Sequence, residues 1–429
     1  MLPKPQTSNF KPQTKKAMEQ EIKKPYKIES AKIMKQIMGD YFLGFKDTKK
    51  KVAWCTSVGP AELLRSFGFE VHFPENHGAL LGATRTANDF IPEATKLGYS
   101  NDICSYLTAD LGSYMKKQTP LQEHYGLEGP PKPDLIVYNT NQCREVQDWF
   151  TYFAREFNCL IYGIKPPRHV DEVTQSDIDD VATQFKGMIP ICEKASGNKF
   201  DIEKFRETIR LSKEATDLWK EVLWTARQTP SPISFFDATI HMGPIVVLRG
   251  TQMAKDYYVT LLAELKENLK KGIGFIEDEK CRIYWDGMPI WGKLRPLSEL
   301  FLQNGAAVVA STYCNSWVFD AFDPKHPFES SAKAYTEIFI NRSEEAKEKL
   351  LIALVKDFRI DGIIFHDAKT CFNNSNSNFG MPQRITAKLG IPTLIIEGDL
   401  CDLRFYSEGQ SITKIETFIE QIEDAKVTC

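Results

Sequence analysis

Residues 134–143 read Asp-Leu-Ile-Val-Tyr-Asn-Thr-Asn-Gln-Cys, and this stretch decides the fold. Its apolar run, Leu135 to Tyr138, is rich in β-forming residues and lies between two prolines and a polar cluster. Such a run is typical of a buried strand that ends where a loop begins. We therefore predict a strand over 135–138 and a polar loop that ends in Cys143.

A second stretch, near the other end of the chain, has the same design: Asp361-Gly-Ile-Ile-Phe-His-Asp-Ala-Lys-Thr-Cys371. It predicts a strand over 363–365 and a short loop that ends in Cys371. Cys104 has a comparable place, because it follows a Gly-Tyr-Ser-Asn turn and precedes a helical stretch. In open parallel sheets, sites form beyond the carboxyl ends of the strands. We therefore expect the three cysteines to meet in a cleft between two similar domains.

Strand and helix patterns alternate on both sides of a helical middle part, which favours parallel sheets. The predicted fold class is α/β, with two similar Rossmann-like parallel-sheet domains joined by a helical segment. Among the elements expected are a helix over 83–97, with His77 in a polar loop before it, and a strand over 306–314. The predicted parts are an N-terminal arm and helix (1–50), a first α/β domain (51–170), a helical connector (171–278) and a second α/β domain (279–429).

The composition excludes several classes of protein. The chain has 429 residues, 42% of them hydrophobic, and a formal charge of −3. This charge gives no nucleic-acid footprint, and the apolar runs are shorter than the roughly 20 residues that a membrane span needs. Residues 1–25 are rich in Lys, Gln and Pro, predict a loosely ordered arm and show no apolar signal-peptide core. We expect a cytoplasmic protein that binds neither nucleic acid nor membrane.

The sequence contains ten cysteines and no Cys-x-x-Cys pair. In a large cytoplasmic chain these are not expected to form disulfides, and most are expected to pack as small buried thiols. Three thiolates that meet at one place can instead hold a metal or an iron–sulfur cluster. With three of the four iron corners of a cubane bound, the remaining corner stays open for chemistry.

Several segments make the sequence similar to one family, the 2-hydroxyacyl-CoA dehydratases and ATP-dependent (class I) benzoyl-CoA reductases. The resemblance covers nearly the whole chain from about residue 30. The segments that carry it are Trp54-Cys-Thr-Ser-Val-Gly-Pro-Ala-Glu-Leu-Leu64, Pro74-Glu-Asn-His-Gly-Ala79, Gly98-Tyr-Ser-Asn-Asp-Ile-Cys-Ser-Tyr106, Asn139-Thr-Asn-Gln-Cys143, Pro230-Ser-Pro-Ile233, Trp285-Asp-Gly-Met-Pro-Ile-Trp291, Asn341-Arg342, His366-Asp-Ala-Lys-Thr-Cys371 and Gly398-Asp-Leu-Cys-Asp-Leu-Arg-Phe-Tyr-Ser407.

The resemblance implies an iron–sulfur enzyme. Active-site subunits of the family carry a [4Fe-4S] cluster on three cysteines, whose positions match Cys104, Cys143 and Cys371, so the cluster is expected in the interdomain cleft. The chain resembles the larger, alpha or B-type subunit. Its implied partners are a smaller homologous subunit, an ATP-hydrolysing iron–sulfur activator and an acyl- or aryl-CoA thioester. Because no Walker-type phosphate loop is present, no bound nucleotide is expected in this chain.

The resemblance leaves two activities open. Both begin with the one-electron reduction of a CoA thioester to a ketyl-type radical anion. Segments such as Arg227-Gln-Thr-Pro-Ser-Pro-Ile-Ser234 favour a benzoyl-CoA reductase, which makes cyclohexa-1,5-diene-1-carbonyl-CoA during anaerobic aromatic degradation. Trp285 to Trp291 and Phe365-His366 look more like the alpha subunit of an (R)-2-hydroxyacyl-CoA dehydratase, a lyase that makes 2-enoyl-CoA. We rank the reductase first and the dehydratase second.

Three side chains are the candidates for catalysis. His366, predicted to lie just past a strand, is expected to face the cluster and to hydrogen-bond a thioester carbonyl. His77 and Glu75 are candidate acid–base groups, although a structural histidine and a helix-start carboxylate explain them as well. His169 carries the same two interpretations as His77. The pair Trp285 and Trp291 fits a hydrophobic core or an aryl pocket.

Other assignments remain as alternatives. Cys55 and Cys314 would join a larger cluster if the chain were a double-cluster reductase relative, and otherwise they are packed thiols. A non-enzymatic interpretation is an assembly protein or an electron-transfer subunit without a substrate of its own. A Rossmann-type dehydrogenase is disfavoured, because no strand is followed by Gly-x-Gly-x-x-Gly.

Overall fold

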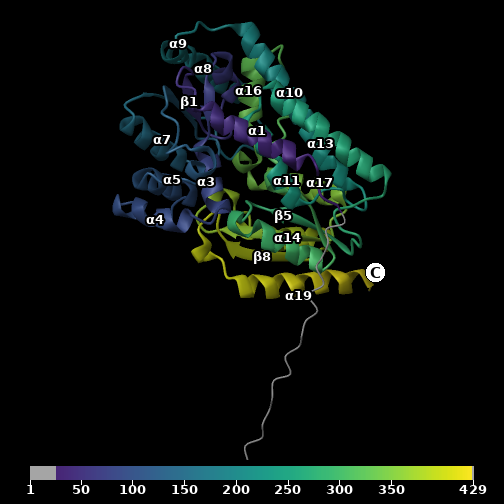
Figure 1. Cartoon of the computed structure of the whole chain (residues 1–429). Helices are drawn as coiled ribbons and strands as arrows, with labels where there is room; N and C mark the ends of the chain where they lie inside the picture. The colour runs from purple at the N-terminus through teal and green to yellow at the C-terminus, as the bar shows by residue number, and fades with distance from the viewer. Residues whose placement is uncertain (1–25, 428–429) are drawn as a thin grey trace, which may run out of the picture.

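The computed structural model describes residues 26–427, and the predicted arm over 1–25 lies outside the described residues. Helix α1 (Ala31–Gly44) precedes the first strand, within the stretch where the sequence predicts a helix. Figure 1 shows it lying across the molecule, between the first sheet and the helices of the middle part.

The first sheet has four parallel strands in the order β2-β1-β3-β4. Its central strands are fully buried, as their apolar runs predict. The strands are β1 (Val52–Cys55), β2 (Glu70–His72), β3 (Leu135–Asn139) and β4 (Leu160–Ile164). The helices of this half are α2 (Ala61–Ser66), α3 (Pro74–Ala83), α4 (Ala87–Lys96), α5 (Ser105–Lys116), α6 (Pro120–Tyr125) and α7 (Glu145–Glu156).

The second sheet repeats this design with four parallel strands in the order β6-β5-β7-β8. Numbered from its own first strand, it has the same order as the first sheet, so the prediction of two similar Rossmann-like sheets is confirmed. The strands are β5 (Cys281–Asp286), β6 (Ala306–Ser311), β7 (Gly362–Ala368) and β8 (Thr393–Gly398). The helices are α14 (Leu294–Gln303), α15 (Thr312–Asn315), α16 (Pro327–Thr336), α17 (Glu344–Phe358), α18 (Met381–Leu389) and α19 (Glu408–Val427).

A group of helices lies between the two sheets in the sequence. They are α8 (Gln175–Gly187), α9 (Ile189–Ser196), α10 (Ile202–Trp224), α11 (Phe235–His241), α12 (Gly243–Val247) and α13 (Gln252–Lys270). Helices α10 and α13 pack against each other along one side of the molecule (Figure 1), and α8 packs against α16 of the second half.

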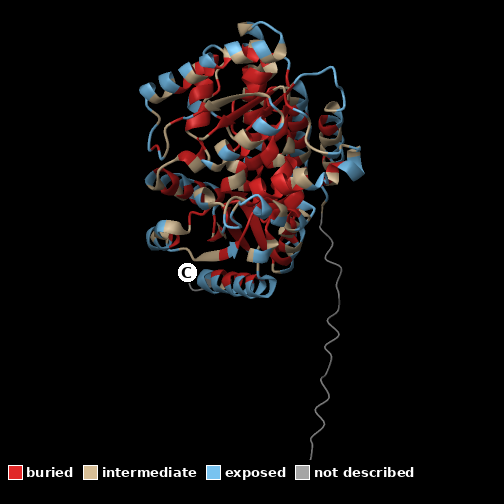
Figure 2. Cartoon of the chain, turned by 90° about the vertical axis from the view of Figure 1, so that its left-hand side faces the viewer, coloured by how far each residue is buried: buried red, intermediate tan, exposed pale blue. Residues whose placement is uncertain are grey.

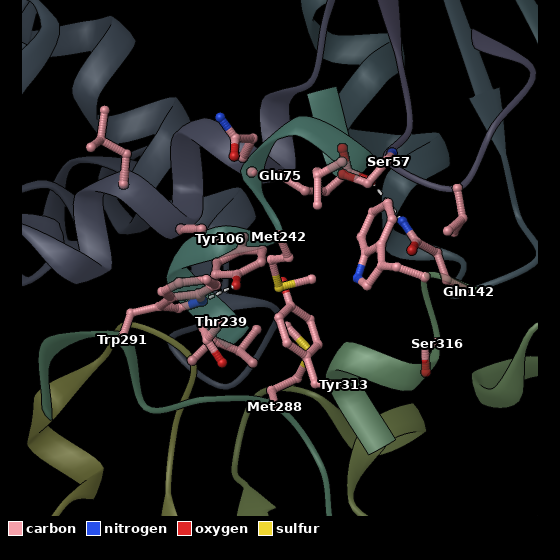
Figure 3. Close-up of a pocket in the computed structure, with 18 of the residues that line it drawn as sticks. Ser57, Glu75, Tyr106, Gln142, Thr239, Met242, Met288, Trp291, Tyr313 and Ser316 are labelled. Carbon is pink, nitrogen blue, oxygen red and sulfur yellow. Dashed lines mark hydrogen bonds between the residues drawn. The ribbon is translucent and has the colours of Figure 1, made fainter. Parts of the chain in front are cut away.

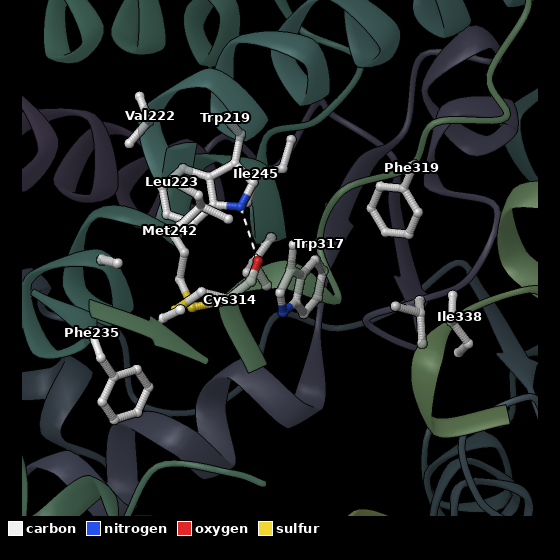
Figure 4. Packing of buried hydrophobic residues seen from close by; sticks show 14 of the residues in the cluster. Trp219, Val222, Leu223, Phe235, Met242, Ile245, Cys314, Trp317, Phe319 and Ile338 are labelled. Carbon is white, nitrogen blue, oxygen red and sulfur yellow. Dashed lines mark hydrogen bonds between the residues drawn. The ribbon is translucent and has the colours of Figure 1, made fainter. Parts of the chain in front are cut away.

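One hydrophobic core runs through both halves and the connecting helices. It contains Val137 from the first sheet, Ile283 from the second and Trp219 from α10. The Trp219 indole donates a hydrogen bond of 3.1 Å to the carbonyl of Cys314, which ties the long helix to the second half (Figure 4). Figure 2 shows the buried residues gathered in the interior of both halves. The two sheets are therefore fixed against one another by shared apolar burial.

Three predicted elements differ from the structure. The helix expected over 83–97 begins only at Ala87, as α4, because the chain turns through Arg85, whose φ of 62° is left-handed, and the polar loop expected before it is α3 (Pro74–Ala83). His77 consequently lies inside α3 and not in a loop. The strand expected over 306–314 ends at Ser311, whose side chain accepts a hydrogen bond from the Cys314 amide and starts α15. Strand β7 extends to Ala368, so His366 lies within the strand and not beyond it.

Candidate functional site

A cavity of about 440 Å³ lies where the carboxyl ends of the two sheets meet. Residues that follow seven of the eight strands line it, which is the position expected for a site in open parallel sheets. In chain order, these residues include Ser57 after β1, Glu75 after β2, Cys143 after β3, Met288 after β5, Tyr313 after β6, Cys371 after β7 and Leu400 after β8.

The three cysteines singled out in the sequence all line this cavity. Cys104 is the residue before α5, Cys143 lies two residues before α7, and Cys371 follows β7. The thiols influence one another electrostatically, since ionisation of Cys371 raises the pKa of Cys104, and both raise the pKa of Cys143. Three cysteines that are far apart in the sequence therefore line one cavity.

The surroundings of each sulfur suit a thiolate held by a metal. Burial raises the pKa of all three thiols, that of Cys371 to about 12, so they are neutral in the absence of metal. Backbone N–H groups oppose this shift: those of Tyr106 and Leu107 at Cys104, Val146 at Cys143 and Asn374 at Cys371. The first turns of α5 and α7 add the positive ends of two helix dipoles.

The chemistry of the three side chains bears on which metal group they fit. Within residues 26–427, no group of three or more His, Cys, Asp or Glu side chains is arranged to hold a metal ion. The cysteines of a cubane cluster each bind a different iron, so they stand farther apart than the ligands of one tetrahedral ion. Three thiols that line one cavity, each near a backbone N–H, supply the thiolate donors that an iron–sulfur cluster needs.

Glu75 is the predicted acid–base group that reaches the cavity. Its Oε1 accepts hydrogen bonds from the Ser57 amide at 2.9 Å and from Nε2 of Gln142, the residue before Cys143, at 2.6 Å (Figure 3). Its Oε2 is buried and has no hydrogen-bond partner in the protein. Burial raises the pKa of Glu75 to about 7, although the hydrogen bond from the Ser57 amide lowers it. This carboxyl group can therefore take or give a proton near neutral pH, close to the loop that carries Cys143.

His77 does not line the cavity. Its Nδ1 lies 2.5 Å from Oδ1 of Asp110, and its Nε2 lies 2.8 Å from Oγ1 of Thr119. The second oxygen of Asp110 accepts a hydrogen bond of 2.8 Å from the indole of Trp149, which does line the cavity. The histidine thus braces the wall of the site from behind.

His366 does not line the cavity either, because β7 carries it into the interior. Burial lowers the pKa of its imidazole, so the ring is neutral and its Nδ1 donates to the carbonyl of Met288 at 2.6 Å. Its Nε2 is buried without a partner. His366 thereby fixes the loop that brings Met288 to the cavity wall.

The remaining residues singled out in the sequence lie either away from the cavity or in its wall. Cys55 and Cys314 are buried in the core and do not line the cavity, and neither does His169. Trp285 stacks on Phe235 within the core, whereas Trp291 lines the cavity and donates to the hydroxyl of Tyr106. Sequence reasoning missed other wall residues, including Ser57, Gln142, Tyr313 and Ser316. Ser57, Gln142 and Tyr313 share one signal, a place two or three residues after the end of a strand, whereas Ser316 follows α15.

The cavity wall is largely apolar. Figure 3 shows Glu75, Ser57 and Gln142 on one side of it and Trp291 and Tyr106 on the other. Among the described residues that line the cavity, the charged ones are Glu75 and Glu145, and none is Lys, Arg or His. Such a wall favours an apolar, uncharged group.

Comparison with known proteins identifies the family. The family model for the 2-hydroxyglutaryl-CoA dehydratase D-component matches residues 56–422. This chain belongs to that family. Its members are CoA-thioester dehydratase and benzoyl-CoA reductase subunits, as the sequence resemblance indicates, and the chain is an enzyme component. No helix of residues 26–427 is long and apolar enough to cross a membrane.

Three relatives show how the similarity is distributed. The alpha subunit of (R)-2-hydroxyisocaproyl-CoA dehydratase from Clostridioides difficile is 30% identical over 89% of this chain and 92% of the relative. The alpha subunit of lactoyl-CoA dehydratase from Anaerotignum propionicum is 30% identical over 87% and 90%. The B-type subunit of benzoyl-CoA reductase from Thauera aromatica is 28% identical over 94% and 97%. These identities do not separate the two activities.

Proposed function

We propose that this chain is the [4Fe-4S] active-site subunit of an enzyme that reduces a CoA thioester by one electron at low potential, through a ketyl radical anion. Its first-ranked activity is that of a B-type benzoyl-CoA reductase subunit, which converts benzoyl-CoA to cyclohexa-1,5-diene-1-carbonyl-CoA. One observation carries the proposal: Cys104, Cys143 and Cys371, far apart in the sequence, line a single cavity that also contains Glu75.

The chain's own residues supply binding, water exclusion and proton transfer. Cys104, Cys143 and Cys371 would hold the cluster, which supplies low-potential electrons when bound. The apolar wall around Met288, Trp291 and Tyr313 binds the acyl group and excludes water. Glu75, with a pKa of about 7 and a free buried oxygen, supplies a proton to a reduced ring carbon. Dearomatisation consumes two electrons and two protons for each benzoyl group.

The chain is proposed to act within a larger assembly in the cytoplasm. Relatives of both activities are named as alpha or B-type subunits, which supports a partner subunit, taken here to be a smaller homologous chain. The electrons come from an ATP-hydrolysing iron–sulfur activator. This chain binds no nucleotide of its own in the proposal.

The charged residues of the cavity wall favour a substrate whose acyl group is uncharged. A second carboxylate on the acyl chain would be buried beside Glu75 and Glu145 without a cation from the described lining residues. Burying an unpaired carboxylate costs several kcal/mol. Benzoyl-CoA meets this requirement, and we expect 2-hydroxyglutaryl-CoA to be used at least roughly 100-fold less efficiently than the best uncharged substrate.

A second candidate is the alpha subunit of an (R)-2-hydroxyacyl-CoA dehydratase with an uncharged acyl group. It is favoured by the 30% identity to two dehydratase alpha subunits. In this reaction Glu75 takes a proton from the substrate radical after hydroxide has left. The electron then returns, so the overall reaction is redox-neutral.

The deciding experiment counts electrons for each turnover. The protein is purified anaerobically with its partner subunit and supplied with activator, ATP and either benzoyl-CoA or (R)-2-hydroxyisocaproyl-CoA. A reductase consumes two electrons for each diene formed, whereas a dehydratase needs electrons only to start. Formation of 2-enoyl-CoA with electrons needed only to start the reaction would show that the chain is a dehydratase subunit and not a reductase subunit. Failure to reduce or dehydrate any CoA thioester would end both.

A further inference from the structure

Arg168 connects the loops of two cavity cysteines. It follows β4, in the segment Lys165-Pro-Pro-Arg-His169, and is half-buried. Its Nη1 donates to the carbonyl of Thr140 at 2.8 Å, three residues before Cys143. Its Nη2 donates to Oδ1 of Asn373 at 3.0 Å, two residues after Cys371. One guanidinium group therefore joins the cysteine loop of the first sheet to that of the second.

The segment that carries Arg168 is itself held from the second half. The side-chain amide of Asn341 donates to the carbonyl of Pro167 at 2.9 Å, and the amide of Val170 donates to the carbonyl of Asn341 at 3.1 Å. His169 between them has a left-handed φ of 56°, a conformation that a non-glycine residue keeps only when its neighbours enforce it. Arg168 is thus presented on a fixed backbone.

A second side chain connects the loop of Cys371 to that of Cys104. Oγ1 of Thr370 accepts a hydrogen bond of 3.0 Å from the amide of Ser105, the residue after Cys104. The same hydroxyl donates to Asp399 at 2.7 Å, after β8. Since Thr370 precedes Cys371 directly, the loop of Cys371 is tied to those of both other cysteines, by Thr370 on one side and by Arg168 on the other.

Arg168 also brings charge to this region. It lies close enough to the buried Lys347 for the two cations to interact, and Lys347 in turn interacts electrostatically with Cys371. The planar guanidinium offers its donors in a rigid fork. A fixed positive charge beside a group of thiolates stabilises their more negative, reduced state.

From these contacts we propose that Arg168 is a positioning residue, which sets the separation of the Cys143 and Cys371 loops and supplies a positive charge beside the metal centre. The inference rests on the proposed function, because the centre is the cluster held by Cys104, Cys143 and Cys371. The hydrogen bonds of the guanidinium set the separation of the two loops, and its positive charge affects the reduction potential of the metal centre. The two contributions are therefore separable by substitution.

The test compares R168Q, R168K and the wild-type protein after anaerobic purification with the partner subunit. R168Q removes the charge and the fork, so a chelator should extract its iron roughly 10–100-fold faster, the usual effect of losing a group that orients metal ligands. Its midpoint potential, measured by redox titration with electron paramagnetic resonance, should be more negative. R168K keeps the charge, so its potential should stay near the wild-type value while its iron is still extracted faster.

A matched control is R342Q. Arg342 donates to the carbonyl of Asp171 at 2.6 Å, three residues beyond Arg168, and this contact does not involve either cysteine loop. R342Q should behave like the wild-type protein. The inference is overturned if R168Q matches the wild-type protein in extraction rate and potential, or if R168K shows the full potential shift of R168Q. If R168Q does not fold, the R168K result alone decides.

Hydrogen exchange separates this inference from the proposed function. In cluster-free protein, R168Q should speed amide exchange in residues 140–143 and 371–375 relative to R342Q. A wild-type protein that binds no iron would end the proposed function, but faster exchange in both loops would still support the connection through Arg168. Unchanged exchange in both loops would overturn it.

Discussion

At the scale of single residues, Glu75 shows how one carboxyl group is prepared for proton transfer. Burial disfavours its charged form, whereas the Ser57 amide and the Gln142 side chain stabilise it. The balance leaves a pKa of about 7, at which the group is half protonated near neutrality. His77 and His366 do not line the cavity, whereas Glu75 does, which is why the carboxyl group is the better placed proton donor or acceptor.

The raised pKa of Glu75 makes a prediction about stability. Because its folded-state pKa lies above the unfolded value, ionisation of Glu75 costs folding free energy as pH rises from about 4.5 to 7. Between pH 5 and pH 8, the wild-type protein should lose roughly 2 to 3 kcal/mol relative to E75Q. Denaturant unfolding of both proteins at the two pH values measures the difference.

E123Q, which changes a glutamate on α6, is the control and should follow the wild-type pH dependence. Parallel pH profiles for E75Q and the wild-type protein would show that Glu75 is not perturbed. E75Q should also lose roughly 10²–10⁴-fold in turnover and, with it, any break in the rate profile near pH 7.

At the scale of elements, the position of Cys104 depends on how α5 packs against α4. Gly112 of α5 lies so close to α4 that an added Cβ would be 1.9 Å from the carbonyl oxygen of Phe90. The atoms of Phe90 that the added Cβ would meet belong to the backbone of α4, so they cannot rotate away as a flexible side chain could. The absence of a side chain at residue 112 therefore sets the placement of the helix that a proposed ligand, Cys104, directly precedes.

G112A should separate α4 from α5 and destabilise the protein by about 3 kcal/mol or more, in the range of severe overpacking. Iron retention should fall as well, since the start of α5 moves. G44A is the matched control, because a Cβ at Gly44 meets nothing within 4 Å and alanine favours the helix. Equal stabilities of the two variants, measured by denaturant unfolding, would contradict this packing.

Most elements were predictable because apolar runs and helix signals agree with the final packing. The strand predicted over 135–138 is β3 (Leu135–Asn139), almost to the residue. Errors arose where a local turn decides the outcome. The left-handed Arg85 delays the start of α4 to Ala87, and the Ser311 cap ends a strand before Cys314.

The site was predictable in part for the same reason. Cys143 and Cys371 follow β3 and β7, and the rule that loops at the carboxyl ends of parallel strands meet explains why both line one cavity. Cys104, which precedes α5, lines the same cavity. The places of His77 and His366 did not follow, because they depend on the exact ends of α3 and β7. The position proposed for Arg168 could not be predicted from the sequence, because it depends on contacts between distant segments. Its hydrogen bond to Asn373 joins residues that are 205 positions apart, and no local pattern contains such a contact.

At the scale of the whole molecule, a buried charged cluster joins three parts of the chain. Glu62 of α2 accepts a hydrogen bond from the hydroxyl of Tyr335 of α16 at 2.6 Å and one from Ser212 of α10 at 2.7 Å. Arg249, which is fully buried, lies 3.2 Å from the same carboxylate. The cluster thus connects the first half, the middle helices and the second half around a compensated pair of charges.

E62Q should leave the charge of Arg249 uncompensated and lower the free energy of unfolding by about 3–5 kcal/mol. The control is E221Q, which breaks the exposed pair between Glu221 and Lys266 and should cost less than about 1 kcal/mol. Denaturant unfolding of the two variants measures the contrast. A small effect of E62Q would show that the buried charged cluster around Glu62 does not hold the parts of the chain together.

The most direct test of the whole account is the iron and sulfide content of the anaerobically purified protein. We expect about four of each per chain in the wild-type protein. C104A, C143A and C371A should each lose them, whereas C401A, which changes a buried cysteine near Cys104 that does not line the cavity, should keep them. Iron-free wild-type protein, or full iron content in all three single variants, would contradict the central claim.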